Sequence, residues 1–309
     1  MNAIVEKALP LWGWHGADYT LVAARENAVY RVRFRGETYA LRLHRIGYRS
    51  DAELRSELDW MAAISKGDLN APSPIPTLSG KTLLTIDNTQ IDALSWLSGA
   101  PLSEHFPSEN RASIFYQLGQ NMAKFHIISD AWTPPDTFTR PAWNRDGLLG
   151  ETPLWDRFWE NPQLTTNEQT LFRQVRTQAN ALLSRHEETL DYGLIHADLV
   201  PTNVMYDAQR LTFIDFDDGG YGYRLFEIAT ALLKFTRDPD YPALRAALIK
   251  GYTNKREINL ELLDFFMLLR ALTYVGWNIS RMNDKGGQAR NARFINTALE
   301  LTKYLKNIN

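Results

Sequence analysis

Apolar and polar residues alternate along the first part of the chain, and this period of two predicts β-strands. Residues 28–34 and 39–44 show the clearest alternation, with a turn at 35–37 between them and a further strand near 19–23. Arg42 falls on the face opposite the apolar one. Neighbouring strands joined by short turns pair antiparallel, so the pattern predicts a meander. The positions expected to face inward are Tyr30, Val32, Phe34, Tyr39, Leu41 and Leu43.

The pattern changes to a helical period at residue 50. Ser50 and Glu53 have the spacing of a capping box, which opens a helix. Glu57 lies beside the apolar stripe of this helix, and the prolines within 70–76 break the pattern. The stripe consists of Leu54, Leu58, Met61 and Ala62.

Two more strands are predicted near 82–86 and 90–97, and residues 98–101 are typical of a hinge. The chain after Pro101 has mainly helical periodicity, apart from an irregular stretch at 130–164 that is rich in Trp and Pro. Expected helices start after the cap Ser108 and at the capping box Thr165–Glu168, and further helical patterns cover 224–235, 242–252, 259–280 and 288–306.

These elements predict an α+β fold with two lobes. A small antiparallel-sheet lobe covers 1–98, and a larger, mainly helical lobe covers 99–309. The net charge of −2 argues against a nucleic-acid partner, and the absence of cysteine excludes disulfides and thiolate metal sites. We find no signal peptide and no apolar run long enough to span a membrane, so we expect a soluble cytoplasmic protein. The sequence leaves the oligomeric state open.

Polar residues follow two short apolar strands in the second half of the chain. His196, Asp198 and Asn203 form the pattern H-x-D-x-x-x-x-N, and Asp215 follows the next apolar strand. This spacing matches the kinase catalytic loop and the Asp-Phe-Gly segment after it, with Asp217 in place of the glycine.

Phosphoryl transfer from ATP needs this set of groups. A carboxylate must orient the attacking hydroxyl and accept its proton, and oxygen ligands must hold Mg²⁺ or Mn²⁺ on the phosphates. Arg42 on a strand and Glu57 on the following helix stand where kinases place a phosphate-binding cation and its partner carboxylate. We expect adenine to bind against the hinge, near Trp96 and Ser98.

The segments that carry these residues resemble the aminoglycoside phosphotransferase and choline kinase-like family, which has the protein-kinase fold. Residues 194–203 with 214–218 look closest to the branch containing the stress-response kinase and type II homoserine kinases. The resemblance implies Asp198 as catalytic base, Asn203 and Asp215 as metal ligands, and Arg42 as phosphate contact.

Three departures from the family pattern stand out. Arg42 replaces the commoner lysine, and no G-x-G-x-x-G is present, since the corresponding turn is 24–28. Glu227 stands where the family usually has an Asp that anchors the catalytic loop, so that role is open. Asp217 is equally open: it joins the metal site or only adds local charge.

The acceptor is the least determined part of the interpretation. Eleven residues separate Asp215 from Glu227, which leaves no room for a long activation segment and favours a small hydroxyl compound, such as an amino alcohol, homoserine or an amino sugar. The alternatives are a Ser/Thr protein kinase, a phosphohydrolase with a metal cluster, and a silent nucleotide-binding protein. The tryptophans at 132, 143, 155 and 159 pack the irregular stretch or, less favourably, form a cage for a quaternary ammonium group.

Overall fold

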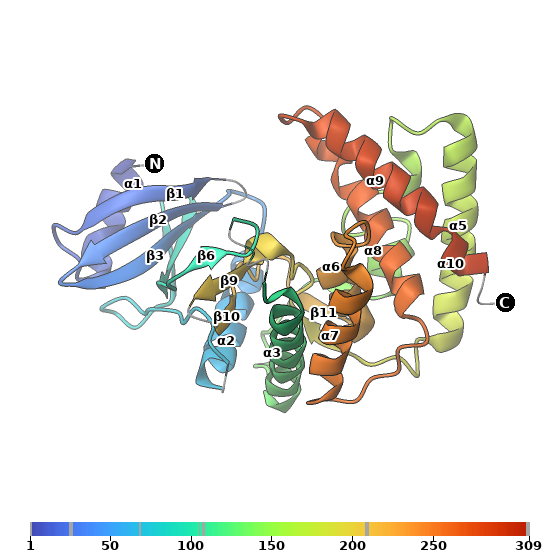
Figure 1. Cartoon of the computed structure of the whole chain (residues 1–309). Helices are drawn as coiled ribbons and strands as arrows, with labels where there is room; N and C mark the ends of the chain where they lie inside the picture. Colours follow the sequence, from blue (N-terminus) through green and yellow to red (C-terminus); the bar gives the residue numbers. More distant parts are fainter. Residues whose placement is uncertain are drawn as a thin grey trace. The chain divides into compact units, whose positions relative to one another are not determined.

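The predicted meander is present in the computed structural model as a five-stranded antiparallel sheet (Figure 1). One face of the sheet covers an apolar core, which includes Tyr30 and Val32 from one strand and Leu41 from the next. Phe34 and Tyr39 are only partly buried. The strand order is β1 (Asp18–Ala24), β2 (Asn27–Phe34), β3 (Glu37–His44), β5 (Thr89–Ser95) and β4 (Leu83–Ile86). The structure describes residues 2–24, 27–67, 69–104, 106, 109–207 and 210–306.

The chain divides into two compact units. Each is assembled from three segments, so the boundaries of the units are not those of a single cut along the sequence. The proposed functional division after residue 98 concerns ligand binding and stays a prediction. Unit 1 contains Met1–Phe106, Ile127–Arg140 and Pro201–Asp217, and unit 2 contains Pro107–His126, Pro141–Val200 and Asp218–Asn309.

Helix α2 (Asp51–Lys66) comes between β3 and β4 in the chain, and its capping box is present as predicted. The Ser50 side chain accepts a hydrogen bond from the backbone N–H of Glu53, whose side chain accepts in return from the backbone of Ser50. The helix ends at Gly67, before the prolines that were expected to end it. Glu57 is fully buried with the apolar stripe.

A second, smaller sheet of unit 1 has the order β10 (Arg210–Phe213), β9 (Val204–Asp207) and β6 (Ala100–Pro101). The predicted hinge runs directly into β6. Gly99 has a φ of 98°, and a Cβ there would lie 2.4 Å from the carbonyl oxygen of Tyr206. A residue with a Cβ could not lie this close to the backbone of β9, so the hinge requires glycine at position 99.

The first residues of the chain form α1 (Asn2–Ala8) and a 3₁₀ turn, η1 (Leu9–Trp12), which the sequence pattern did not predict. Val5 and Trp12 are buried in the core beneath the sheet. Both elements are too short to show a helical period, and their burial comes from tertiary packing.

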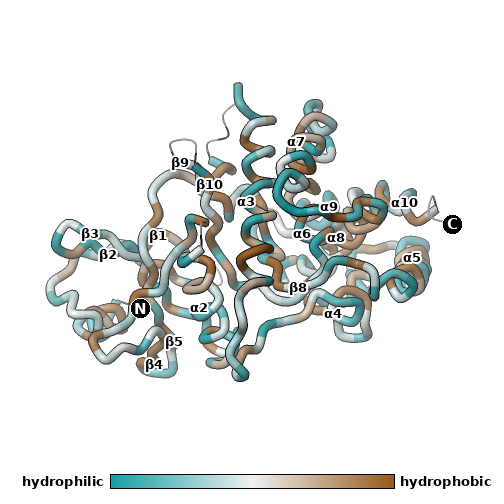
Figure 2. The backbone as a smooth tube through the Cα atoms, turned by 90° about the horizontal axis from the view of Figure 1, so that it is seen from below, coloured by the Kyte–Doolittle hydropathy of each residue, from teal (hydrophilic) through white to brown (hydrophobic). Residues whose placement is uncertain are grey.

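Unit 2 is mainly helical, and its expected helices are present. The capping box at Thr165 opens α5, and α6 and α8 are almost entirely buried. Figure 2 shows both hydrophilic and hydrophobic residues in α5, as expected for a helix with one exposed face. Ser108, the expected cap of α3, lies outside the described residues. The main helices after the hinge are α3 (Arg111–Ala131), α5 (Thr166–His186), α6 (Arg224–Leu233), α7 (Tyr241–Thr253), α8 (Leu263–Trp277), α9 (Gly287–Leu301) and α10 (Lys303–Lys306).

A third sheet lies within unit 2, where only the strand ending at Ile195 had been predicted. It has the order β7 (Ala142–Trp143), β11 (Gly220–Tyr223) and β8 (Tyr192–Ile195), with β7 and β11 parallel. The stretch expected to be irregular also contains α4 (Arg145–Leu149) and η2 (Phe158–Glu160). Two-residue strands and single helical turns carry no periodic signal, which is why the pattern missed them.

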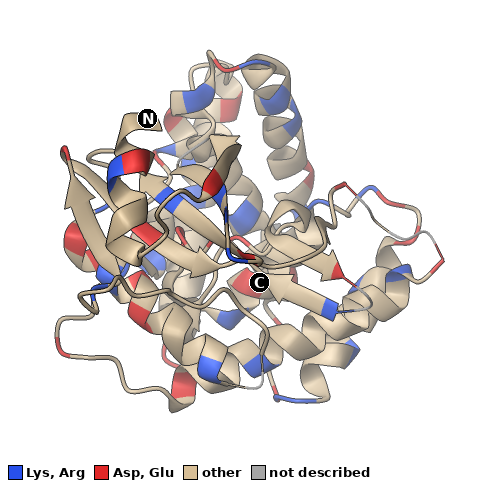
Figure 3. Cartoon of the chain, turned by 90° about the vertical axis from the view of Figure 1, so that its left-hand side faces the viewer, with Lys and Arg blue, Asp and Glu red and all other residues tan. Residues whose placement is uncertain are grey.

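No helix among the described residues is long and apolar enough to cross a membrane. Figure 3 marks the positions of Lys and Arg and of Asp and Glu along the ribbon, and the two kinds are interspersed, in keeping with the small net charge.

Candidate active site

The two predicted metal ligands lie at the open end of one β-hairpin in unit 1. Asn203 directly precedes β9, and Asp215 follows β10 by two residues. The backbone N–H of Ile214 donates to the carbonyl of Asn203 at 3.0 Å, so the hairpin brings the two short segments together. Asp215 has a φ of 66°, a left-handed conformation that is uncommon for a residue with a side chain.

These two side chains offer an amide oxygen and a carboxylate, and the chain has no cysteine. Hard oxygen donors of this kind suit Mg²⁺ or Mn²⁺, which usually take one or two protein ligands and complete their coordination with phosphates and water. Among the described residues, no group of three or more His, Asp or Glu side chains is arranged to hold a metal ion.

The predicted base, Asp198, lies in unit 2 just after β8. Its neighbours His196 and Ala197 are fully buried, whereas the Asp198 side chain is 24% exposed. Arg270 of α8 donates from Nη2 to Oδ1 of Asp198 at 2.7 Å and to the hydroxyl of Tyr274 at 3.1 Å. One carboxylate oxygen is therefore oriented by a buried cation while part of the side chain stays accessible.

Arg270 was not among the site residues predicted from the sequence, although a signal was present. It is the one charged residue in an apolar run of α8 from Phe265 to Val275. The guanidinium is fully buried and lies 4.5 Å from the ring centre of Trp155 and 4.4 Å from that of Tyr274. Its Nε and Nη1 have no hydrogen-bond partner among the described residues. A buried arginine with one carboxylate partner is costly to keep, which points to a role at Asp198.

The open question about Glu227 is answered by its contacts. Its Oε2 accepts a hydrogen bond from the backbone N–H of Ala197 at 3.2 Å, so the longer carboxylate does reach the loop. Ala197 has a φ of 63°, and this contact stabilises its strained backbone. Burial raises the pKa of Glu227 to about 7, against the lowering effect of hydrogen bonds from the loop backbone and the charges of Arg224 and Arg270.

His126 of α3 is part of the buried core of unit 2. The ring is fully buried, and Nδ1 lies 2.8 Å from the hydroxyl of Tyr252. Burial, with the charges of Arg224 and Arg256, holds the pKa of His126 well below its usual value.

The predicted ion pair between Arg42 and Glu57 is present in unit 1, with Nη1 and Oε1 2.8 Å apart. The structure adds Asp92, which receives two further hydrogen bonds from Arg42, Nε to Oδ1 at 2.8 Å and Nη2 to Oδ2 at 2.7 Å. His44 Nε2 lies 2.7 Å from the same Asp92 oxygen. Three of the five N–H donors of the guanidinium are thus engaged by carboxylates.

Burial lowers the pKa of Arg42, but Asp92 and Glu57 outweigh it and raise the pKa well above its usual value. For Asp92 the balance runs the other way: burial raises its pKa, and the charges of Arg42 and His44 bring it well below the usual range. Arg42 and Asp92 therefore stay ionised. Asp92 could have been found from the sequence as a lone charge between buried apolar residues of β5.

Asp217 is buried, and its surroundings are arginines. Its carbonyl accepts hydrogen bonds from Arg140 at 2.7 Å and Arg49 at 2.9 Å, and its Oδ1 lies 3.7 Å from Nε of Arg49. Burial, with the charge of Glu57, raises the pKa of its carboxyl. Whether Asp217 joins the metal site stays open.

The residues expected near adenine lie where the hinge begins. Trp96 follows β5 and is partly exposed, with the guanidinium of Arg31 5.9 Å from its ring centre. Ser98 is exposed and donates a hydrogen bond to the carboxylate of Asp207 at the end of β9. Their contact with a nucleotide stays a prediction. Of the turn at 24–28, residues 25–26 lie outside the described residues.

The tryptophans of the irregular stretch pack the chain. Trp143 stacks on Phe226 at 5.4 Å and donates from Nε1 to the carbonyl of Asp218. Arg176 covers the buried ring of Trp159, and Arg270 covers Trp155. These rings already have cationic or aromatic neighbours, which favours packing over an ammonium cage.

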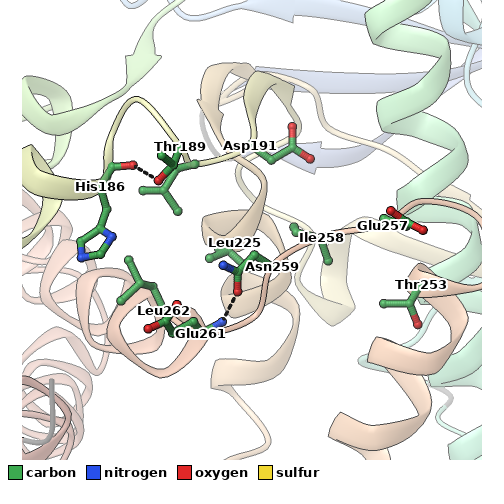
Figure 4. Close-up of a pocket in the computed structure, with 11 residues that line it drawn as sticks. His186, Thr189, Asp191, Leu225, Thr253, Glu257, Ile258, Asn259, Glu261 and Leu262 are labelled. Atoms are coloured by element: carbon green, nitrogen blue, oxygen red, sulfur yellow. Dashed lines mark hydrogen bonds between the residues drawn. The ribbon is translucent and has the colours of Figure 1, made fainter.

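A cavity of about 610 Å³ lies in unit 2, between the end of α5, the start of α6 and the segment after α7 (Figure 4). The residues that line it include the apolar Leu225 and Leu262 and the acidic Asp191, Glu257 and Glu261. The predicted site residues do not line this cavity.

Comparison with known proteins decides the family. The profile of the phosphotransferase enzyme family matches residues 18–265, which is most of the chain. The chain belongs to this family. The resemblance inferred from the catalytic motif is confirmed, and with it a phosphoryl-transferring enzyme of the kinase-like fold.

The chain is 24% identical to amicoumacin kinase of Bacillus subtilis strain 168 over 287 residues, covering 88% of this chain and 83% of that protein. It is 26% identical to a homoserine kinase of Sinorhizobium medicae strain WSM419 over 265 residues, covering 84% and 76%.

Among solved structures, a microcompartment-associated aminopropanol kinase superimposes with a TM-score of 0.83 at 27% identity, covering 99% of this chain and 97% of that one. The amicoumacin kinase hAmiN, in complex with AMP-PNP, Ca²⁺ and Ami, has a TM-score of 0.77 at 21% identity, covering 98% and 93%.

Proposed function

We propose that this enzyme transfers the γ-phosphoryl group of ATP to a hydroxyl group of a small amino alcohol. The observation that carries the proposal is the exposure of the Asp198 carboxylate and its hydrogen bond with Arg270. In a loop that is otherwise buried, its carboxylate is partly exposed, and Arg270 fixes one of its oxygens. A carboxylate held in this way can accept a hydrogen bond from an acceptor hydroxyl and orient it for attack.

In this proposal Asn203 and Asp215 hold Mg²⁺, which would neutralise charge on the phosphates. Arg42 contacts the phosphates with the N–H groups that Asp92 and Glu57 leave unused. Trp96 and Ser98 lie against adenine, and residues 1–98 act as the nucleotide-binding lobe. The AMP-PNP and Ca²⁺ bound in hAmiN support a nucleotide and a divalent ion as ligands of this fold.

The substrate class rests on the relatives. Aminopropanol and homoserine both carry an amino group and a primary or secondary hydroxyl, and both are named as substrates of similar proteins. The relatives also include an antibiotic kinase, so a larger amino-bearing hydroxyl compound is the second choice. Small-molecule acceptors of this kind favour our proposal over a Ser/Thr protein kinase.

The test is ADP release from ATP and Mg²⁺ with a panel of acceptors: 1-amino-2-propanol, ethanolamine, homoserine, choline and an amino sugar. The matched control for each is the deoxy compound, which keeps the amino group and lacks the hydroxyl. We expect ADP release that requires both the hydroxyl and Mg²⁺. ADP release at the same rate without any acceptor would favour a hydrolase, and release only with a protein acceptor would favour a protein kinase.

A further inference from the structure

Arg140 connects the helix carrying Glu57 to the segment carrying Asp215. Its side chain is fully buried in unit 1 and comes from the segment after α3, where no sequence signal marked it. Nη2 donates to the carbonyl oxygens of Phe216 and Asp217, each at 2.7 Å. Nη1 lies 3.3 Å from Oε2 of Glu57.

The segment that Arg140 holds needs support. Asp215 is in the left-handed region, which costs a residue with a side chain about 1 kcal/mol or more, and such a conformation persists only when its surroundings enforce it. Phe216 is fully buried, and its ring meets that of Trp60 on α2 edge-on at 5.6 Å. Arg140 therefore holds the two backbone carbonyls that follow Asp215. The contact with Trp60 holds the side chain of Phe216 in the same segment.

The same arginine also reaches the phosphate-binding cluster. Oε1 of Glu57 accepts from Arg42, and Oε2 of the same carboxylate faces Arg140. Burial raises the pKa of Glu57, but the charges of Arg42 and Arg140 outweigh it, so the shared carboxylate is ionised. A chain of contacts therefore runs from Arg42 through Glu57 and Arg140 to the backbone beside Asp215.

We propose that Arg140 is a positioning residue that couples the phosphate-binding Arg42 to the metal-binding segment at Asp215, so that Mg²⁺ and nucleotide bind cooperatively. The inference rests on the proposed function, because it needs Asp215 as a metal ligand. It assigns a role to a residue that touches neither ligand.

The chemistry of arginine explains why this position needs one. A guanidinium presents several N–H donors in a planar fork and can bond a carboxylate and two carbonyl oxygens together. The contacts of Arg140 use both ends of that fork, with the carbonyl of Glu53 as a further acceptor at 3.2 Å. A lysine keeps the charge but has one compact ammonium group, so it cannot span Glu57 and both carbonyls.

The experiment measures AMP-PNP affinity by calorimetry with and without Mg²⁺, and the readout is the ratio of the two dissociation constants. In Arg140→Lys we expect the gain in affinity from Mg²⁺ to fall at least fivefold, with the Mg²⁺-free affinity changed less. Arg55→Lys is the matched control. It lies on α2 with a half-exposed side chain near Asp51 and should leave the ratio unchanged.

A merely structural role would lower the melting temperature of Arg140→Lys and leave the Mg²⁺ ratio within twofold of the wild-type value, and this result would overturn the inference. Arg140→Gln, which removes the charge, should lower the ratio further if it folds. Because lysine keeps the charge, we expect that variant to stay folded and to decide the question alone.

The proposed function fails in a different way. If wild-type enzyme binds AMP-PNP with a gain from Mg²⁺ but transfers phosphoryl to no acceptor, the acceptor proposal is wrong and the role of Arg140 is still measured by the ratio. If the wild-type enzyme shows no gain from Mg²⁺, the cooperativity itself is absent and the inference is refuted.

Discussion

Arg42 and Asp92 are register partners on β3 and β5, and two parallel hydrogen bonds join the guanidinium to the carboxylate. Both side chains are buried, and Glu57 completes the set of charges on Arg42. The arginine that replaces the usual lysine is thus matched by a second carboxylate across the sheet. The fork of the guanidinium makes this double pairing possible.

Two substitutions of Arg42 should separate the effect of its positive charge from the effect of the planar guanidinium. Arg42→Ala leaves Asp92 and Glu57 buried without their main partner, so we expect a loss of about 3–5 kcal/mol in unfolding free energy. ATP use should also fall more in Arg42→Ala than in Arg42→Lys, which keeps the charge and loses the fork. Denaturant unfolding and the KM for ATP check both points. Equal and negligible effects of the two changes on ATP kinetics would rule out the phosphate contact.

Asp215→Ala should abolish activity, because the phosphates lose the ion that neutralises them. The expected signature is a loss of turnover that added Mg²⁺ does not restore. An Mg²⁺ titration of the variant checks this, with Asp136→Ala at an exposed turn as a control outside the proposed site. Near-wild-type turnover of Asp215→Ala at any Mg²⁺ concentration would show that the metal assignment is wrong.

Arg270→Met should lower kcat by at least tenfold and leave the KM for ATP nearly unchanged. Methionine fills much of the same space between Trp155 and Tyr274, but it leaves the carboxylate of Asp198 without its orienting donor. Steady-state kinetics measure the split, and circular dichroism checks folding. Arg237→Met, at an exposed pair with Glu300, should change neither constant. An unchanged kcat in folded Arg270→Met would mean that this contact does not serve the reaction.

Glu227 predicts a pH dependence of stability. Its folded pKa of about 7 exceeds the unfolded value of about 4.5, so between these pH values the folded state holds a proton that the unfolded state has lost. Stability should therefore fall as pH rises through this window, and the loss is complete above about pH 7.

The measurement compares denaturant unfolding of wild type and Glu227→Gln from pH 5 to pH 8. The glutamine variant lacks this titration, so the wild-type free energy should fall relative to it by on the order of 2 kcal/mol. His126 and Arg224, which face Glu227, are common to both proteins. Parallel pH curves would contradict the raised pKa.

Local rules were sufficient for the elements with a clear period or cap. The meander around Arg42 and the helix opened by Ser50 follow from alternation and a capping box, and both are present. The Arg42–Glu57 pair also followed, because the two residues stand where kinases place a phosphate-binding cation and its partner carboxylate.

The residues that contact the predicted site residues could not be predicted from local patterns, because tertiary structure brings them together. Asp92 meets Arg42 only through strand pairing, and Arg140 reaches Phe216 from a stretch without periodicity. Arg270 was visible as a lone charge in an apolar helix, but its partner was not. Short strands such as β7 form because another segment of the chain pairs with them. A local sequence pattern does not predict such pairing.

The most direct test of the account follows a labelled γ-phosphoryl group from ATP in wild type and in Asp198→Asn. Asparagine keeps the shape of the side chain and loses the proton acceptor. We predict that wild type places the label on the hydroxyl of an amino alcohol, and that the folded variant binds ATP with nearly unchanged affinity but transfers the label at least a hundredfold more slowly. Undiminished transfer by a folded, ATP-binding Asp198→Asn would contradict the account.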